Sequence, residues 1–492
     1  MSLDQFVDRL RNGEPAKFPS TANTLAWAQS LDEQDKLSHL RDEFIIPTKA
    51  SLKKKSLDGR IPGQPAQNGV TNGASHEGDE QGIYFVGNSL GAQPKAVRQY
   101  VDAQLETWAS IGVAGHFQDM EESPLPKWQD LAEDCAKKSA DIVGSSPEEI
   151  VIMNTLTANL HMMMASFYKP TEKRHKIILE WRPFPSDYYA IESQITWHGL
   201  DPEKSMVKIE PDDSYLIPTE RVLSVIDEHS EETALLLLPG IQYFSGQFFD
   251  MPRITAHAKA KGITVGWDLA HAAGNVELKL HDWDIDFACW CTYKYINAGP
   301  GSIAGAFVHE RHGKVEWPQG ESGKPSYRPR LTGWYGGDKS VRFKMDNNYV
   351  PIVGAGGFQV SNPSAIDLAS LSGALSVFNK TCMRDLRSKA LVLTAYAEYL
   401  LDQMTAEFGG STPAFRVLTP RDPLQRGTQL SVMLASEQLH DAVSAALEAN
   451  GVMCDKRKPN VIRVAPVPLY SRFEDVWRFM EILKGALAKL NA

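Results

Sequence analysis

Lys294 stands between two tyrosines, directly after an apolar run and ahead of the glycine-containing turn AGPGS. Desolvation in such surroundings favours the neutral amine, which is the form that condenses with a carbonyl compound to give a Schiff base. A carboxylate, Asp268, ends another apolar run 26 positions earlier (294 − 268). An isolated lysine or aspartate at the end of a strand is more often an ion-pair member or a solvated charge. The pair therefore indicates a catalytic site only if neighbouring residues also fit one.

Three further features of the sequence match what pyridoxal phosphate (PLP) requires. Thr157 lies in NTLTAN, ahead of the apolar run LHMMMASFYKP, and a threonine at a helix start beside backbone N–H groups makes an anion site for the phosphate. Phe184, in FPSD after the strand-like KIILE, offers a ring face for stacking. The Asp268 carboxylate would keep the pyridine nitrogen protonated, so that the ring acts as an electron sink. Taken singly, an ordinary N-cap, a loosely packed ring and a solvated acid explain these residues equally well.

Short apolar strands alternate with helices through the middle of the chain. Strands are predicted at 83–86, 176–180, 234–240, 263–268, 286–291 and 301–308, and an amphipathic helix at 254–262. Continuous apolar strands separated by helices are typical of a parallel α/β sheet covered on both faces. Ligands bind at the carboxyl ends of the strands in such sheets. Asp268 and Lys294 both follow strand ends, which places them on the binding edge.

The two ends of the chain differ from its middle. Residues 1–47 show apolar residues at helical spacing up to Pro47, and about 50–81 are rich in Gly, Pro, Asn and Ser, which is typical of a flexible surface insertion. From about 362 the chain is mostly helical, with strand candidates in TQLSVML and NVIRVAPV. We therefore predict an N-terminal helical segment over 1–82 that packs with a smaller α+β domain at 362–492, and a large domain with a mostly parallel sheet at 83–361.

Composition limits the possible partners. The 492 residues carry a net charge of −10, and the short basic runs lie in polar stretches, which argues against nucleic acid as a partner. The five cysteines show neither zinc-finger nor CxxC spacing, so we expect free thiols and no metal site. The N-terminus lacks the apolar core of a signal peptide, and no segment reaches the roughly 20 apolar residues of a membrane span. We expect a cytoplasmic protein without a membrane partner.

Longer ordered motifs identify a family. The stretch 267–310, WDLAHAAGNVELKLHDWDIDFACWCTYKYINAGPGSIAGAFVHE, resembles the core of the kynureninases. So do YFVGNSLGAQP (84–94), FPSDYYAIESQ (184–194), RFKMDN (342–347), SNPS (361–364) and CDKRKPNVIRVAPVPLY (454–470). The resemblance runs from about Tyr84 nearly to the C-terminus. It implies the fold-type I architecture of PLP-dependent transferases, in the class-V aminotransferase-like branch that also holds the cysteine desulfurases.

Transferred residue by residue, the resemblance implies a complete cofactor site. Lys294 would attach the cofactor as a Schiff base and would form the catalytic pair with Tyr293, which would also hydrogen-bond the phosphate. Asp268 would pair with the pyridine nitrogen. The cofactor-binding residues that the resemblance implies are Leu156, Thr157, Phe184, Pro185, Ser186, Asp187, Asp268, His271, Tyr293, Lys294, Trp334 and Asn362. One departure is Pro239, which offers neither a hydroxyl nor an N–H where some relatives carry a serine near the cofactor.

The resemblance also implies how the substrate is held. Arg463 would clamp the α-carboxylate, a task that suits a bidentate guanidinium better than a lysine. The other substrate-binding residues would be Ser89, His116, Ser361 and Asn362. Part of the shell comes from the neighbouring subunit in such enzymes, so the resemblance implies a homodimer with shared active sites.

The implied reaction is hydrolytic cleavage of the Cβ–Cγ bond of L-kynurenine or 3-hydroxy-L-kynurenine. It yields anthranilate or 3-hydroxyanthranilate plus L-alanine, in tryptophan catabolism towards NAD. The nearest alternatives are another fold-type I enzyme, such as a cysteine desulfurase or an aminotransferase. A non-catalytic metabolite sensor is disfavoured because Lys294 and Asp268 are both present, and a Rossmann dehydrogenase is disfavoured because no GxGxxG follows an early strand. The sequence does not fix which of the two substrates is preferred.

Overall fold

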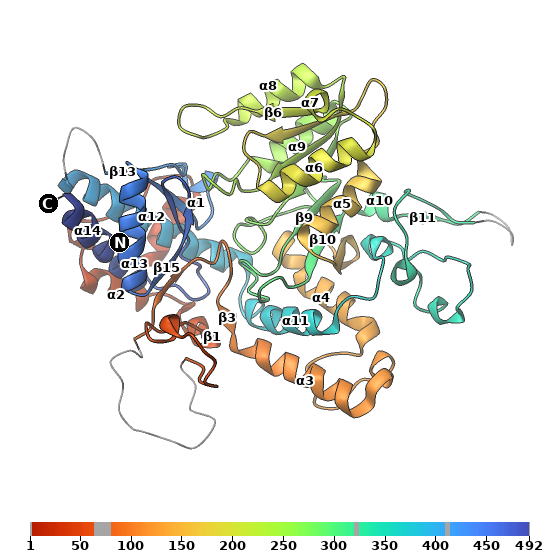
Figure 1. The fold of residues 1–492 in the computed structure, drawn as a ribbon, viewed down its shortest axis with the longest axis horizontal. Coiled ribbons are helices and arrows are strands. Elements are labelled where there is room, and N and C mark those ends of the chain that lie inside the picture. Colours follow the sequence, from red (N-terminus) through yellow and green to blue (C-terminus); the bar gives the residue numbers. More distant parts are fainter. Residues whose placement is uncertain (1, 63–79, 319–323, 409–413, 492) are drawn as a thin grey trace. The chain divides into compact units, whose positions relative to one another are not determined.

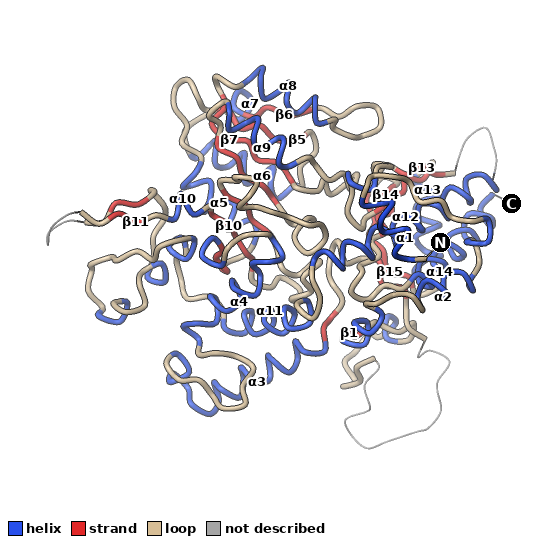
Figure 2. Tube along the Cα trace, turned by 180° about the vertical axis from the view of Figure 1, so that it is seen from behind, coloured by secondary structure: helices blue, strands red, loops and turns tan. Residues whose placement is uncertain are grey.

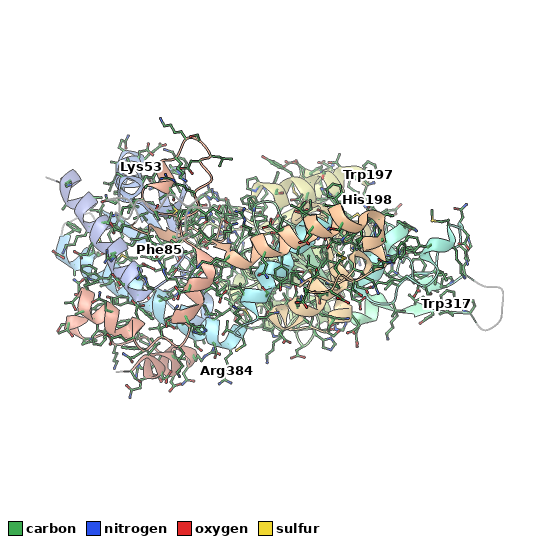
Figure 3. The ribbon with its side chains drawn as sticks, turned by 90° about the horizontal axis from the view of Figure 1, so that it is seen from below. Lys53, Phe85, Trp197, His198, Trp317 and Arg384 are labelled. Carbon is green, nitrogen blue, oxygen red and sulfur yellow. The ribbon has the colours of Figure 1, made fainter. Side chains whose placement is uncertain are left out.

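The computed structural model describes residues 2–62, 80–318, 324–408 and 414–491 (Figure 1). The chain divides into two compact units. The large unit comprises Val97–Tyr243 and Phe248–Met383, and the small unit comprises Met1–Ala96, Phe244–Gln247 and Arg384–Ala492. Arg384, labelled in Figure 3, marks the point where the chain returns to the small unit. The small unit is therefore assembled from segments near both ends of the sequence.

A seven-stranded sheet forms the centre of the large unit. Its strands follow the order β4-β10-β9-β8-β7-β5-β6, and Figures 1 and 2 show them with helices on both sides. The strands are β4 (Ile150–Met153), β5 (Lys176–Glu180), β6 (Met206–Ile209), β7 (Thr233–Pro239), β8 (Thr264–Asp268), β9 (Phe287–Trp290) and β10 (Ala304–Val308). Neighbouring strands are parallel except at β10, which runs antiparallel to both β4 and β9. The predicted α/β class with a mostly parallel sheet is confirmed.

Apolar runs account for the central strands of this sheet. β7 carries four consecutive leucines, Leu235 to Leu238, and all four are buried, as expected for a strand covered on both faces. The connection from β9 to β10 contains no helix, and without a helical crossover the chain turns back and pairs antiparallel. The edge strands β4 and β6 were not predicted. β6 reads MVKI and is only partly buried, so it lacks the continuous apolar character of the others.

The large unit contains the helices that cover its sheet and others outside them. They are α3 (Lys95–Ile111), α4 (Trp128–Val143), α5 (Leu156–Phe167), α6 (Pro185–Trp197), α7 (Pro202–Ser205), α8 (Thr219–His229), α9 (Met251–Ala260), α10 (Glu310–Gly313) and α11 (Ala365–Phe378). α5 packs against α6, and both contribute to one core with strands of the sheet. Within the described ranges, no helix combines the length and the apolar character needed to cross a membrane.

α11 packs on α4 in the large unit, where Cys135 Sγ lies 3.2 Å from Ser372 Oγ. The large unit accordingly extends to Met383, whereas the sequence analysis places its end at residue 361. The predicted boundary differs from that in the structure because α11 is apolar on nearly all sides. Its sequence therefore does not reveal which of the two hydrophobic cores it joins.

The small unit is built on a five-stranded sheet of order β13-β14-β16-β15-β2. Its strands are β2 (Ile83–Phe85), β13 (Phe415–Val417), β14 (Leu430–Leu434), β15 (Val452–Arg457) and β16 (Val461–Val464), and its helices are α1 (Leu3–Arg11), α2 (Leu25–Asp32), α12 (Met383–Phe408), α13 (Glu437–Ala449) and α14 (Phe473–Asn491). The strand candidates TQLSVML and NVIRVAPV correspond to β14 and β16. Phe6, Leu10 and Leu31 from the N-terminal helices lie in the core of this unit.

β2 is a strand that the sequence analysis assigned to the start of the large domain. In the structure it pairs parallel with β15, with Ile83 opposite Val452. Phe85, labelled in Figure 3, is 1% exposed and packs against Phe479 of α14 with ring centroids 5.7 Å apart. A three-residue apolar strand has the same appearance in either sheet, so its sequence could not decide between them.

The N-terminal segment is less helical than predicted. α1 begins at a capping box of Ser2 and Gln5, and α2 ends at Asp32. A 3₁₀ turn over Ser38–Glu43 follows, and then β1 (Phe44–Ile45) pairs with β3 (Gln93–Pro94). The predicted helix up to Pro47 is wrong here, because β-branched residues ahead of a proline favour extended backbone. Of the predicted insertion at 50–81, residues 63–79 lie outside the described residues.

Two glycines give opposite predictions for stability. A methyl group at Gly305 on β10 would lie 2.3 Å from Cε2 of the buried Trp290, whereas nothing lies within 4 Å of one at Gly485 on α14. We expect Gly305→Ala to lower the free energy of unfolding by about 2 kcal/mol through overpacking. Gly485→Ala, the control, should leave it unchanged or raise it by up to about 1 kcal/mol. Denaturant titration of both variants measures this, and a Gly305→Ala protein as stable as wild type would contradict the packing described.

Candidate active site

A cavity of about 230 Å³ opens at the carboxyl ends of the parallel strands in the large unit. Strand ends supply three of its charged residues: Glu180 ends β5, Asp268 ends β8, and Lys294 follows β9. Asp187 comes instead from the first turn of α6. The full lining is Thr155, Leu156, Thr157, Glu180, Phe184, Ser186, Asp187, Pro239, Ile241, Tyr243, Asp268, Ala270, His271, Tyr293, Lys294 and Gly301. The edge of the sheet at which we expected a ligand is therefore the edge that carries the cavity.

The amine of Lys294 sits inside this cavity against a histidine. Lys294 is 8% exposed, and its Nζ lies 3.0 Å from His271 Nε2. The ring centroids of Phe184 and Tyr293 lie 5.9 Å and 6.0 Å from the same nitrogen. At 3.0 Å one of the two nitrogens must present a lone pair to a proton on the other. The contact therefore gives the buried amine a partner for proton exchange.

Two buried carboxyl groups, those of Asp187 and Asp268, face each other in the cavity. Asp268 Oδ1 accepts a hydrogen bond from Ala270 N at 2.6 Å, which fixes its orientation. Burial, and next the neighbouring Asp268 carboxyl, raise the pKa of Asp187 well above its usual range. Asp187 Oδ1 is buried and has no hydrogen-bond donor among the described residues. The pair thus calls for a proton or a cationic N–H group, and a protonated pyridine nitrogen fits that requirement.

Two helix N-termini meet at the same cavity. α5 begins at Leu156 and α6 at Pro185, and neither N-cap residue, Thr155 or Phe184, makes a side-chain capping hydrogen bond. On α5 the first backbone N–H groups are therefore left for a ligand, and on α6 that of Ser186 is, since Pro185 has no N–H and Asp187 N donates to Phe184 O at 2.9 Å. The hydroxyls of Thr157 and Ser186 lie within hydrogen-bonding distance of each other beside them. Helix N-termini attract anions, so this arrangement fits the phosphate of PLP.

Tyr293 contributes a hydroxyl that stays protonated at neutral pH. Burial, and next the Cys291 thiol, raise the pKa of Tyr293. A phenol of this kind donates a hydrogen bond rather than accepting a proton. Phe184 is 43% exposed, and its ring meets that of Tyr243 edge-on at 5.5 Å, so the two rings stand at the rim of the cavity.

Sequence reasoning missed Glu180, although it ends the predicted strand KIILE and the strand-end rule could have found it. Glu180 is 1% exposed and accepts hydrogen bonds from Arg182 N at 2.6 Å and Gln242 Nε2 at 3.3 Å. Burial raises its pKa to about 7. Pro239, which the sequence analysis left out of the site, lines the cavity at the end of β7 without offering a hydroxyl.

Pro185, between the lining residues Phe184 and Ser186, does not itself line this cavity, and two further predicted cofactor residues lie elsewhere in the large unit. Trp334 is 47% exposed, and its indole N–H donates to the carbonyl of Arg342 at 3.0 Å. Asn362 lines a second hollow of about 400 Å³ together with His116 and Trp128. Ser361, beside Asn362, is exposed. Within one chain, these residues are therefore separate from the cavity that holds Lys294.

The two remaining predicted substrate residues belong to the small unit. Ser89 follows β2 and is partly buried. Arg463 lies on β16, is 1% exposed, and pairs with Asp455 through Nη2–Oδ2 at 2.7 Å and Nε–Oδ1 at 3.2 Å. Asp455 therefore holds the guanidinium in a fixed orientation.

Comparison with protein families gives two matches. Residues 83–344 match the model described as Aminotransferase class-V, and residues 386–483 match Kynureninase C-terminal domain. The chain is 69% identical over 483 residues to Kynureninase 1 of Neurospora crassa, covering 98% of each chain. It is 60% identical over 490 residues to a kynureninase of Pyricularia oryzae, covering 96% of this chain and 97% of the relative.

Solved structures share the fold at low identity. A cysteine desulfurase from Thermococcus onnurineus aligns with a TM-score of 0.64 and 18% identity, covering 83% of this chain and 95% of the other. A mutant of C-DES, described with glycine covalently linked to its PLP cofactor, aligns with a TM-score of 0.65 and 17% identity, covering 82% of this chain and 96% of the other. These likenesses establish the fold-type I architecture.

The raised pKa of Glu180 predicts a pH dependence of stability. The folded protein holds the Glu180 proton up to a pH of about 7, whereas an unfolded glutamate releases it near about 4.3. The wild type should therefore lose stability relative to a Glu180→Gln variant as pH rises through this window, by on the order of 2 kcal/mol between about pH 5 and pH 8. Urea titrations at both pH values measure the difference. A gap between the two proteins that does not grow with pH would contradict the assignment.

Proposed function

The chain belongs to the kynureninase family, and we propose that it cleaves the Cβ–Cγ bond of L-kynurenine hydrolytically, releasing anthranilate and L-alanine. It is a PLP-dependent hydrolase acting on carbon–carbon bonds. The proposal extends to 3-hydroxy-L-kynurenine, which would give 3-hydroxyanthranilate. It also places the protein in the cytoplasm, in tryptophan catabolism towards NAD.

The observation that carries the proposal is the composition of one cavity. It brings the amine of Lys294, the carboxyl pair of Asp187 and Asp268, and the N-termini of α5 and α6 to a single edge of the sheet. These are an attachment point, a partner for a ring nitrogen and a phosphate cradle, which together fit PLP. When bound, PLP supplies an electron sink that stabilises negative charge on the carbon bearing the substrate's amine.

The side chains of the cavity would divide the remaining work. We assign attachment of the cofactor and proton transfer at the substrate's Cα to Lys294 Nζ, with His271 Nε2 at 3.0 Å as its partner. The Asp268 carboxylate would hold the ring nitrogen and keep it protonated, with Asp187 beside it. Thr157 and Ser186 would bind the phosphate with the helix N-termini.

Other residues would hold the phosphate, the ring and the substrate. We assign to Tyr293 a hydrogen bond to the phosphate and proton transfer, and to Leu156 and Pro185 backbone positions beside the phosphate. Phe184 would stack on the ring. Arg463 would bind the substrate's α-carboxylate, a task that the fixed geometry of its pair with Asp455 supports. Ser89, Ser361, Asn362 and His116 would line the pocket for the rest of the substrate.

A homodimer would complete the site. Trp334, Phe343 and Phe117 are 47%, 41% and 53% exposed, and their rings form a chain with centroid distances of 5.3 Å and 5.1 Å. Exposed aromatic clusters of this kind are typical of protein interfaces. The cluster includes Trp334, a predicted cofactor residue that does not line the cavity of its own chain. We therefore propose that a second copy of the chain receives Trp334 and Asn362 into its active site.

Three assays separate the proposed reaction from its rivals. Incubation with kynurenine should produce fluorescent anthranilate with no keto acid present. A cysteine desulfurase would instead release sulfur from cysteine, and an aminotransferase would require a keto acid. Absence of anthranilate together with either of the other activities would contradict the proposal. Comparing kcat/KM for kynurenine and its 3-hydroxy form then shows which substrate is preferred.

Lys294→Ala tests the attachment point. We expect the variant to lose the visible absorbance of lysine-bound cofactor and to lose kcat by at least about a thousandfold, because no other lysine of the described residues lines the cavity. Lys138→Ala is the matched control, since Lys138 pairs with Asp134 on α4 and lies outside the cavity. Absorption spectra and anthranilate release measure both. A Lys294→Ala protein that keeps the wild-type band would rule out the assignment.

Mixing two inactive variants tests the shared site. Lys294→Ala and Asn362→Ala should each have little activity as separate homodimers. After reversible dissociation and remixing, about half of the dimers would be hybrids with one intact site, so activity should return to about a quarter of wild type. The control is each variant taken through the same procedure alone. No recovery in the mixture, with hybrids demonstrated by two different affinity tags, would contradict shared active sites.

A further inference from the structure

A second group of potential ligands lies at the opposite edge of the large unit's sheet. Glu149, His281 and His309 each offer one donor atom, and these atoms all lie within 4.8 Å of one another. Glu149 immediately precedes β4, and His309 immediately follows β10. None of the three lines the cavity that holds Lys294. Among the described residues, these three form a group of histidine and carboxylate side chains that could hold a metal ion.

The sheet register explains why Glu149 and His309 meet, and a backbone hydrogen bond from His281 N to Gly144 O at 3.2 Å holds the segment of His281 nearby. β4 and β10 pair antiparallel with Ile150 opposite Phe307, so the residues just outside this pair, Glu149 and His309, come side by side. Val308 pairs in turn with Phe287, the first residue of β9, which places the group at the amino ends of the parallel strands. The cavity lies at the carboxyl ends, so a ligand in this group has no direct part in the chemistry.

The Glu149 oxygens stand at nearly the spacing that a tetrahedral metal ion needs from each histidine donor. His281 Nδ1 lies 2.9 Å and 3.0 Å from the two Glu149 oxygens, and His309 Nδ1 lies 3.8 Å from Oε1. Ligands about 2.1 Å from a zinc ion in tetrahedral geometry stand about 3.4 Å apart, so each observed distance is within about half an ångström of that value. The two imidazole rings are stacked with centroids 5.0 Å apart and an interplanar angle of 22°, so both present an edge to the same carboxylate.

Neighbouring groups hold two of the donors in place. Glu149 is fully buried and accepts hydrogen bonds from Glu310 N at 2.9 Å and Ser146 N at 3.2 Å. His309 is 8% exposed, and its Nε2 faces Asp284 Oδ1 at 3.5 Å. A carboxylate on the far nitrogen of a histidine fixes the tautomer in which the near nitrogen, here Nδ1, carries the lone pair. His281, whose side chain is 42% exposed, leaves the group open to solvent on one side.

We propose that Glu149, His281 and His309 bind one divalent transition-metal ion, with a water molecule as fourth ligand on the side of His281. Two imidazoles and one carboxylate suit Zn²⁺, and also Co²⁺, better than Mg²⁺ or Ca²⁺, which prefer oxygen ligands. The ion would connect the start of β4, the segment after β8 and the end of β10. It would act as a structural clip, replacing the hydrogen bonds between His281 and Glu149 and the one that His309 Nδ1 accepts from Arg311 N at 3.4 Å.

Titration of the PLP-loaded enzyme with Zn²⁺ after chelator treatment tests the proposal. Isothermal calorimetry should give one tight equivalent, and His281→Ala should weaken its binding by at least about tenfold. His281 is the residue to replace because it is the exposed member of the group, so the fold does not depend on it. His257→Ala is the matched control: His257 also pairs with a carboxylate, Asp227 at 3.0 Å, but is absent from any metal-binding group of the described residues. Equal loss in both variants, or none in His281→Ala, would overturn the proposal.

Two further readouts identify the ligands and the role of the ion. Co²⁺ in place of Zn²⁺ should produce visible bands of four-coordinate cobalt in the difference spectrum, absent in both His281→Ala and His309→Gln. Saturating Zn²⁺ should raise the midpoint of thermal unfolding in the wild type and not in His281→Ala. It should leave the absorbance of the bound cofactor unchanged. Six-coordinate cobalt spectra, or a zinc-induced change in the cofactor band, would contradict a clip at the far edge of the sheet.

Discussion

Two carboxyl groups buried side by side set the main constraint on this protein. Burial, and next the neighbouring Asp268 carboxyl, raise the pKa of Asp187 well above its usual range. A cofactor with a protonated ring nitrogen would offer an N–H donor to these carboxyl groups, so its binding would also stabilise the folded large unit.

The sheet is what makes this arrangement possible. Parallel strands β5, β7 and β8 bring Glu180, Pro239 and Asp268 to one edge, although they are far apart in the sequence. The return of β10 beside β9 then shapes the segment that follows β9 and carries Lys294. Charged groups lie close together there because they follow or end neighbouring strands. The two helix N-termini add partial positive charge without a basic side chain.

Much of this could be predicted from the sequence. Apolar runs such as KIILE and ALLLLPG clearly indicate buried strands, and ligands bind at the carboxyl ends of parallel strands. The positions of Asp268 and Lys294 at strand ends therefore predicted that both belong to the site. Glu180 was missed although the same rule applies to it. The position of Trp334 and Asn362 outside the cavity could not be predicted from one chain, because their proposed partners belong to another copy. Glu149 and His281 escaped notice because they are 132 positions apart, and only the fold brings them together.

The pairing of β2 with β15 has a consequence for synthesis on the ribosome. Phe85 is translated early, but Val452 to Cys454, which pair with its strand, emerge nearly 370 residues later (452 − 85 = 367). At roughly 5 to 20 residues per second, the N-terminal helices and β2 wait on the order of half a minute with their apolar faces uncovered. The large unit can form meanwhile, since its chain is complete by Met383. The small unit can therefore complete its sheet only near the end of translation.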